Sequence, residues 1–134
     1  MKTILSLFDY SGAWSKPYLE AGYNVIRVDP KLLGKAPVNK RGVFSGSHIY
    51  GNIKHTNNET LIPCTLAYLI KNIELKGIHG LLAAPPCTDF ATSGSKYFKE
   101  KDIDGRTDES LQIVKELFDV VDLVEPVWYA IENP

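Results

Sequence analysis

The chain has 134 residues, 44% of them hydrophobic, and its 15 Lys and Arg nearly balance its 16 Asp and Glu. This length predicts a single domain with one core over residues 1–134, and the near-neutral charge excludes a nucleic-acid binder that relies on a basic surface alone. The two cysteines lack metal-ligand spacing, which argues against structural zinc and against a disulfide framework. The apolar runs are too short for a signal peptide or a membrane span, so we expect a soluble cytoplasmic protein.

The amino-terminal part predicts a strand, a helix and a second strand. Residues 4–8 form an apolar run typical of a strand, and a turn follows it. Residues 15–17 are expected to open a helix, because proline is tolerated in a first turn, and Gly22 to end it. Residues 25–29 predict the second strand, and residues 31–47 predict a long loop with at most a partial helix.

The middle of the chain predicts a short strand and a helix. Residues 48–53 are expected to form the strand, and Thr60 to cap a helix that runs to Glu74 with Pro63 in its first turn. The residues expected to face the sheet are Leu61, Leu66, Leu69, Ile70 and Ile73. Cys64 would lie on this helix as a small buried hydrophobic residue.

The carboxyl-terminal part predicts a strand at residues 78–84, a helix that begins at residues 107–109, and a last strand at residues 127–131. The expected buried stripe of the helix comprises Leu111, Val114, Leu117, Phe118, Val121 and Val124. Strands that alternate with helices predict an α/β fold with an open parallel sheet of about five strands.

Polar residues follow the predicted strands, and in a parallel sheet they would gather at one edge, where ligands bind. They are Asp9 to Gly12, Asp29, Asn52, Cys87 and Glu132. A glycine-containing turn with an acid about twenty residues later indicates a cofactor with a ribose. Because Gly12 is the only glycine of that turn, S-adenosylmethionine fits better than NAD. The alternative for Asp29 is a carboxylate that merely caps a turn.

Cys87 follows two prolines directly after the predicted strand at residues 78–84. Prolines fix φ and disfavour helix in the preceding residue, so the thiol would emerge at the carboxyl end of this strand. This placement favours a nucleophilic cysteine, with a buried structural thiol as the alternative.

These motifs, in this order, resemble the amino-terminal catalytic part of DNA (cytosine-5) methyltransferases, particularly the small phage-encoded members. Residues 7–15 resemble the family's Phe-x-Gly-x-Gly-Gly-Phe cofactor turn, Asp29 its ribose acid, and residues 51–53 its Gly-Asp-Ile adenine contact. Residues 85–87 resemble its Pro-Pro-Cys-Gln loop, and residues 132–133 its Glu-Asn-Val element. The departures from the family pattern are Tyr10, Ala13, Asn52, Thr88 and Pro134.

The resemblance implies a Rossmann-like methyltransferase fold that binds S-adenosylmethionine, without a metal, and methylates carbon 5 of cytosine in DNA in a bacterial or phage-infected cytoplasm. Cys87 would attack carbon 6 of a flipped cytosine, and Glu132 would stabilise the charge that develops on the ring. The implied cofactor-binding residues are Phe8, Ser11, Gly12, Trp14, Asp29, Asn52, Ile53 and Pro85. For Trp14, packing against the first helix is the alternative.

Family members continue past the glutamate motif, so the resemblance also implies a catalytic domain that is incomplete at its carboxyl end. The last strand would then be an apolar sheet edge, and we expect self-association through residues 127–131. A non-catalytic cofactor-binding or assembly module with the same fold is the second hypothesis. A nucleotide-dependent transferase that acts on a small substrate is the third.

Overall fold

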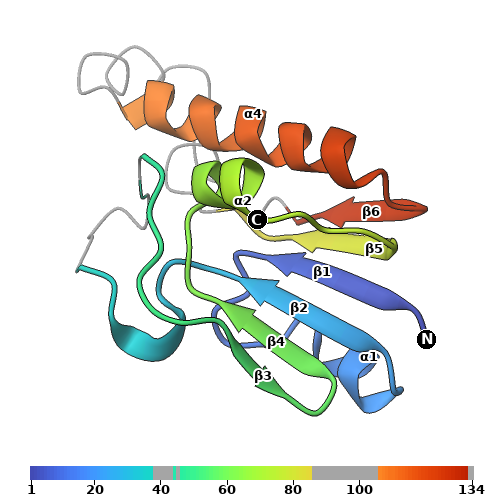
Figure 1. The fold of residues 1–134 in the computed structure, drawn as a ribbon. Helices are drawn as coiled ribbons and strands as arrows, with labels where there is room; N and C mark the ends of the chain where they lie inside the picture. The colour runs from blue at the N-terminus through green and yellow to red at the C-terminus, as the bar shows by residue number, and fades with distance from the viewer. Residues whose placement is uncertain (38–43, 45, 86–105, 133–134) are drawn as a thin grey trace.

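The computed structural model describes residues 1–37, 44, 46–85 and 106–132, with side chains from residue 111 onward in the last range. The elements are β1 (Thr3–Leu7), α1 (Lys16–Glu20), β2 (Asn24–Val28), the 3-10 helix η1 (Leu32–Gly34), β3 (Lys54–Thr56), β4 (Glu59–Ile62), α2 (Leu66–Asn72), β5 (Ile78–Ala83), α4 (Arg106–Val124) and β6 (Trp128–Ile131). Together they form an α/β fold around one twisted sheet (Figure 1).

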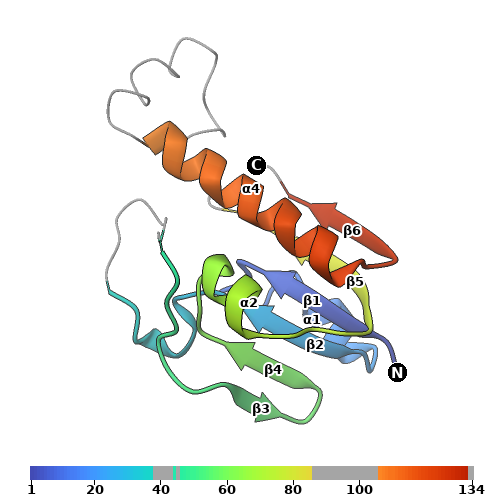
Figure 2. The same ribbon diagram turned by 45° about the horizontal axis from the view of Figure 1, so that its top comes forward.

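The six strands of the described residues follow the order β3-β4-β2-β1-β5-β6. Every neighbouring pair is parallel except β3 with β4, which is antiparallel. From β1 the chain first adds strands on the β2 side and then returns to add β5 and β6 on the other side, as Figure 2 shows. This reversal beside β1 is the switch point at which open α/β sheets bind ligands, outside the carboxyl ends of the strands.

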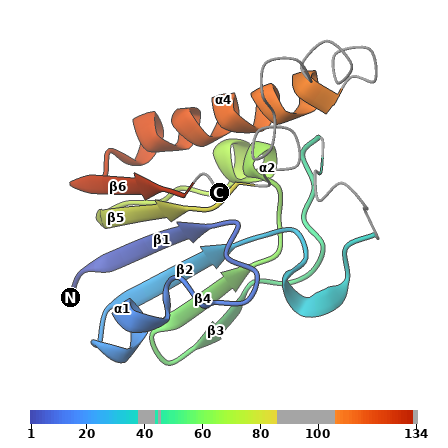
Figure 3. The same cartoon turned by 180° about the vertical axis from the view of Figure 1, so that it is seen from behind.

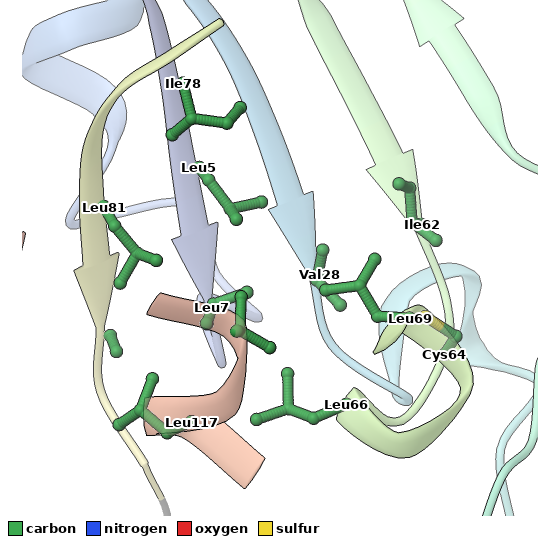
Figure 4. Packing of buried hydrophobic residues seen from close by; sticks show 12 residues of the cluster. Leu5, Leu7, Val28, Ile62, Cys64, Leu66, Leu69, Ile78, Leu81 and Leu117 are labelled. Atoms are coloured by element: carbon green, nitrogen blue, oxygen red, sulfur yellow. The ribbon is translucent and has the colours of Figure 1, made fainter. Parts of the chain in front are cut away.

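Helices cover the two faces of the sheet unequally. Helices α2 and α4 lie on one face, and the short α1 lies on the other (Figures 1 and 3). Successive residues of a strand point to opposite faces, so Leu5 packs in the α2–α4 layer while its neighbour Ile4 packs on the α1 side. In Figure 4, strand residues point toward Leu117 of α4 and Leu66 of α2. Burial of each large aliphatic side chain in this layer stabilises the fold by about 1.5–3 kcal/mol.

The sequence predictions for β1, α1, β2, β5, α4 and β6 are confirmed to within two residues at each end. The predicted α/β fold with an open, mostly parallel sheet is confirmed, but the sheet has six strands in the described residues, because β3 adds an antiparallel strand at one edge. The expected long loop after β2 contains only the 3-10 helix η1 within its described residues.

The predicted helix over residues 60–74 is wrong in its first half. Asn57 adopts φ 48°, which turns the chain between β3 and β4, and the hairpin aligns Lys54 with Leu61. Residues Glu59–Ile62 therefore form a strand beside β2. The helix begins later at Leu66, and its cap is Thr65, whose hydroxyl oxygen accepts from the Tyr68 N–H at 3.3 Å.

The predicted strand over residues 48–53 is also wrong. Within it, Ile49 makes only an isolated antiparallel bridge with Cys64, and the Tyr50 N–H donates to the Pro63 carbonyl at 2.7 Å. The segment thus crosses the carboxyl end of β4 as an irregular connection. The following residues, Lys54–Thr56, supply the strand instead.

The predicted stripe of α4 is confirmed in part, because Leu117 is buried and Val121 and Val124 pack against the core. The buried residues of the helix include Ile113, Leu117 and Val120, whereas Leu111 and Phe118 are 51% and 43% exposed. The helix packs against α2 as well as the sheet, and this second contact rotates its buried face toward α2. Among the described residues, no helix combines the length and apolar character that a membrane crossing requires.

Candidate functional site

The carboxyl ends of four strands meet at one edge of the sheet through backbone hydrogen bonds. The Phe8 N–H, directly after β1, donates to the Val28 carbonyl of β2 at 2.8 Å. The Ala84 N–H after β5 donates to the Leu7 carbonyl at 3.1 Å, and the Glu132 N–H after β6 donates to the Ala83 carbonyl at 2.8 Å. The segments that carry the predicted site residues therefore leave the sheet side by side.

The turn between β1 and α1 is organised around Asp9, which is buried at 5% exposure. Its Oδ2 atom accepts from the Ser6 hydroxyl at 2.8 Å and from the Ser15 N–H at 3.1 Å. The Asp9 carboxylate thereby ties the end of β1 to the start of α1. Phe8 enters this turn with φ 61°, a backbone conformation that is costly for a residue other than glycine.

Arg27 of β2 spans the same turn, a contact that the sequence analysis missed. Its Nη1 atom donates to the carbonyl oxygens of Asp9 and Tyr10, both at 3.2 Å. Its Nε atom lies 3.1 Å from Glu59 Oε2 of β4 but is not aligned for a hydrogen bond, so that contact is an ion pair. An arginine within the apolar run of residues 25–28 was the available signal.

Backbone conformation and packing both favour glycine at position 12 of this turn. Its φ of 79° is disfavoured for residues with a side chain, and a Cβ atom there would lie 2.5 Å from Arg27 Nη1. The guanidinium group of Arg27 thus occupies the space that a side chain at position 12 would need. The structure therefore explains the glycine by its packing against Arg27, whereas the sequence suggested that a ligand approaches the backbone closely at this position.

Asp29 lies at the end of β2 and is 6% exposed. Its Oδ1 atom accepts from the Lys31 N–H at 2.7 Å, so one carboxylate oxygen caps the following turn, as the alternative interpretation predicted. Burial raises the pKa of the Asp29 carboxyl, and the charge of Asp9 raises it further, whereas the Lys31 N–H, the Lys31 charge and the Arg27 charge lower it. Asp9 and Asp29 thus place two acidic groups close together at this edge.

The predicted adenine contact, residues 51–53, lies beside the segment that follows Asp29. A Cβ atom built on Gly51 would lie 3.6 Å from Lys35, and 3.7 Å from both Leu33 and Pro63. The side chains of Asn52 and Ile53 are exposed, Ile53 by 41%. The structure therefore brings this motif next to the carboxyl ends of β2 and β4.

The remaining predicted cofactor residues occupy different environments. Ser11 is exposed, and its hydroxyl accepts from the Ala13 N–H at 3.2 Å. Trp14 is half-buried and packs against the cluster of Ile4, Val25 and Leu82, which agrees with the packing alternative. Pro85 is half-buried after β5.

The two predicted catalytic residues follow neighbouring strands. Glu132 comes directly after β6 and is exposed, and Cys87 lies outside the described residues. Cys64 is fully buried in the connection between β4 and α2, where burial raises the pKa of its thiol to about 12. The expectation that Cys64 packs in the core is confirmed, although it precedes the helix and does not lie on it.

Comparisons with known proteins assign no family to this arrangement. No family model matches the sequence, and no curated protein and no solved structure is similar enough to count as a match. In the part of the chain that the structure describes, no group of three or more His, Cys, Asp or Glu residues is placed to hold a metal ion.

Proposed function

We propose that this chain is the catalytic part of a DNA (cytosine-5) methyltransferase that uses S-adenosylmethionine. The observation that carries the proposal is the parallel pairing of β5 with β6, because the Pro-Pro-Cys segment follows β5 and Glu132 follows β6. The hydrogen bond from the Glu132 N–H to the Ala83 carbonyl, 2.8 Å long, joins the two strand ends. A nucleophile and an acid at adjacent strand ends suit attack on a ring and stabilisation of its charge.

The acidic groups at the neighbouring strand ends support S-adenosylmethionine over a dinucleotide. Burial is the main cause that raises the pKa of Asp29, and the charge of Asp9 adds to it in the same direction. Such a pair favours a cationic sulfonium and disfavours a pyrophosphate. Asp29 uses Oδ1 for the Lys31 N–H, and its Oδ2 is the atom that would accept from a ribose hydroxyl.

The proposed chemistry divides the work between Cys87 and Glu132. The Cys87 thiolate adds to carbon 6 of a flipped cytosine, and Glu132 holds a proton at ring N3 as charge develops there. S-adenosylmethionine supplies the methyl group for carbon 5. Loss of the carbon 5 proton then expels the thiolate and frees the enzyme.

The second hypothesis is a non-catalytic cofactor-binding or assembly module that keeps this fold. The favouring observation is that Asp29 already caps its own turn through Oδ1. The methyltransferase and a cofactor-binding module both predict cofactor binding, whereas an assembly module does not. Only the methyltransferase predicts a covalent complex with DNA. A test of cofactor binding and a test of adduct formation therefore separate them.

The first test is calorimetric titration of the chain with S-adenosylmethionine. We expect binding to the wild type and at least a tenfold loss of affinity in Asp29→Ala, because the acceptor for the ribose is removed. The matched control is Asp122→Ala, an exposed aspartate on α4, which should bind as the wild type does. No binding by the folded wild type would contradict the methyltransferase hypothesis and favour an assembly module.

The second test is incubation of the full-length protein with S-adenosylmethionine and duplex DNA that contains 5-fluorocytosine, followed by denaturing electrophoresis. Fluorine cannot be removed from carbon 5 as a proton can, so the thiol adduct should accumulate in the wild type. The adduct should be absent in Cys87→Ser. Cys64→Ala, which removes the buried thiol, should still form the adduct. Cofactor binding without any adduct would favour the module, and an adduct in Cys87→Ser would overturn the nucleophile assignment.

A further inference from the structure

The β1–α1 turn is held from outside its own sequence. Arg27 reaches from β2 to the carbonyl oxygens of Asp9 and Tyr10, each at 3.2 Å, and its side chain is only 11% exposed. Glu59 of β4 holds the other side of the guanidinium group, 3.1 Å from Nε. The conformation of the turn therefore depends on residues of two other strands.

The packing around Gly12 makes this dependence specific. A Cβ atom at Gly12 would lie 2.5 Å from Arg27 Nη1, so any side chain at this position would force the guanidinium group to move. Asp9 fixes the same turn from the opposite end through the Ser15 N–H. The turn is thus clamped by a carboxylate at one point and by a guanidinium at another, which limits the positions that its backbone N–H groups can take.

We infer that Arg27 is a positioning residue that shapes the β1–α1 turn for the methionine half of the cofactor, an inference that rests on the function proposed above. The sheet order β4-β2-β1 sets the direction of the bound molecule. Asp29, at the end of β2, takes the ribose, and residues 51–53, beside β4, lie on the adenine side. The part beyond the ribose then lies over the end of β1, at the turn that Arg27 holds.

This assignment predicts a selective effect on two ligands. Arg27→Met keeps most of the aliphatic packing but removes both hydrogen bonds to the turn. We expect affinity for S-adenosylmethionine to fall roughly tenfold or more and affinity for adenosine to change less than about twofold. Asp29→Ala should lower the affinity for both ligands, because both carry the ribose. Lys76→Met, which removes an exposed cation paired with Glu74, should change the affinity for neither ligand.

Isothermal titration with S-adenosylmethionine and with adenosine, on variants whose circular dichroism matches the wild type, measures these ratios. If Arg27→Met lowers the affinity for both ligands equally, or lowers neither affinity, the positioning role is overturned and the proposed function still stands. If Arg27→Met does not fold, Arg27→Lys replaces it, since one ammonium keeps the charge near Glu59 but lacks the planar fork. Wild-type protein that binds neither ligand would instead contradict the proposed function.

Discussion

Asp29 illustrates at the scale of one residue how a buried carboxylate can weaken a fold. Its carboxylate is 6% exposed, and burial and the Asp9 charge both raise its pKa. Because the pKa is higher in the folded state than in the unfolded chain, ionisation near pH 7 opposes folding. That destabilisation disappears as the pH falls below the pKa of the unfolded chain. A buried charge that opposes folding is typical of a site where function is retained at the expense of stability.

Asp29→Asn is therefore expected to stabilise the chain at pH 7, by about 3 °C in Tm, while it weakens cofactor binding. The asparagine oxygen can still accept from the Lys31 N–H. Thermal unfolding followed by circular dichroism from pH 7 to pH 4 checks this, and the advantage of the variant should shrink toward acid pH. A lower Tm at pH 7 would show that the carboxylate stabilises the fold.

At the scale of elements, α4 shows that a helix can be correctly located while its buried face is predicted only in part. Leu117 is 1% exposed between the sheet and α2, whereas Leu111, also on the predicted stripe, is 51% exposed. Phe118 is half-exposed and meets Tyr129 of β6 edge to face, with ring centroids 6.4 Å apart. The helix therefore has one apolar side in the core and a second along the β6 edge.

Leu117→Ala should lower the free energy of unfolding by about 2–5 kcal/mol, because it leaves a cavity in the core. Leu111→Ala is the matched control, since it removes the same atoms from an exposed site, and its effect should stay within about 0.5 kcal/mol. Urea denaturation monitored by tryptophan fluorescence provides both values. Similar losses in the two variants would mean that the Leu111 side of α4 is covered in solution.

At the scale of the whole molecule, the sheet has unlike edges. One edge strand is β3, which is exposed and polar. The other is β6, which in the described residues pairs only with β5. Val127, which directly precedes β6, is 74% exposed, and Tyr129 of β6 is 51% exposed. An apolar edge strand with free backbone groups is a template for pairing with another chain.

We therefore expect the protein to self-associate through β6, in a concentration-dependent way that light scattering can follow. Val127→Lys should reduce association severalfold, because it places a charge at the edge. Leu123→Lys is the control, since it adds the same charge at an exposed apolar site on α4 that faces the groove beside α2. A wild-type monomer at high concentration, or equal effects of the two variants, would contradict pairing at this edge.

Features that depend on neighbouring residues were determined by the sequence itself. Short apolar runs determine β1, β2, β5 and β6, since a buried strand needs only a local hydrophobic segment and turn residues at its ends. The sheet topology then brings the segments after these strands to one edge, as their order predicted. Cys87 lies outside the described residues, so its position stays a prediction.

Features that depend on distant contacts were decided only by the tertiary structure. Glu59–Ile62 form a strand although their pattern suits a helix, because the Asn57 turn and pairing with β2 outweigh a weak local preference. Packing of α4 against α2 selects its buried face, and Arg27 reaches Gly12 only when β2 lies beside β1. Local patterns specify which segments can form a strand or helix, whereas the side chains that meet depend on contacts between segments far apart in the chain.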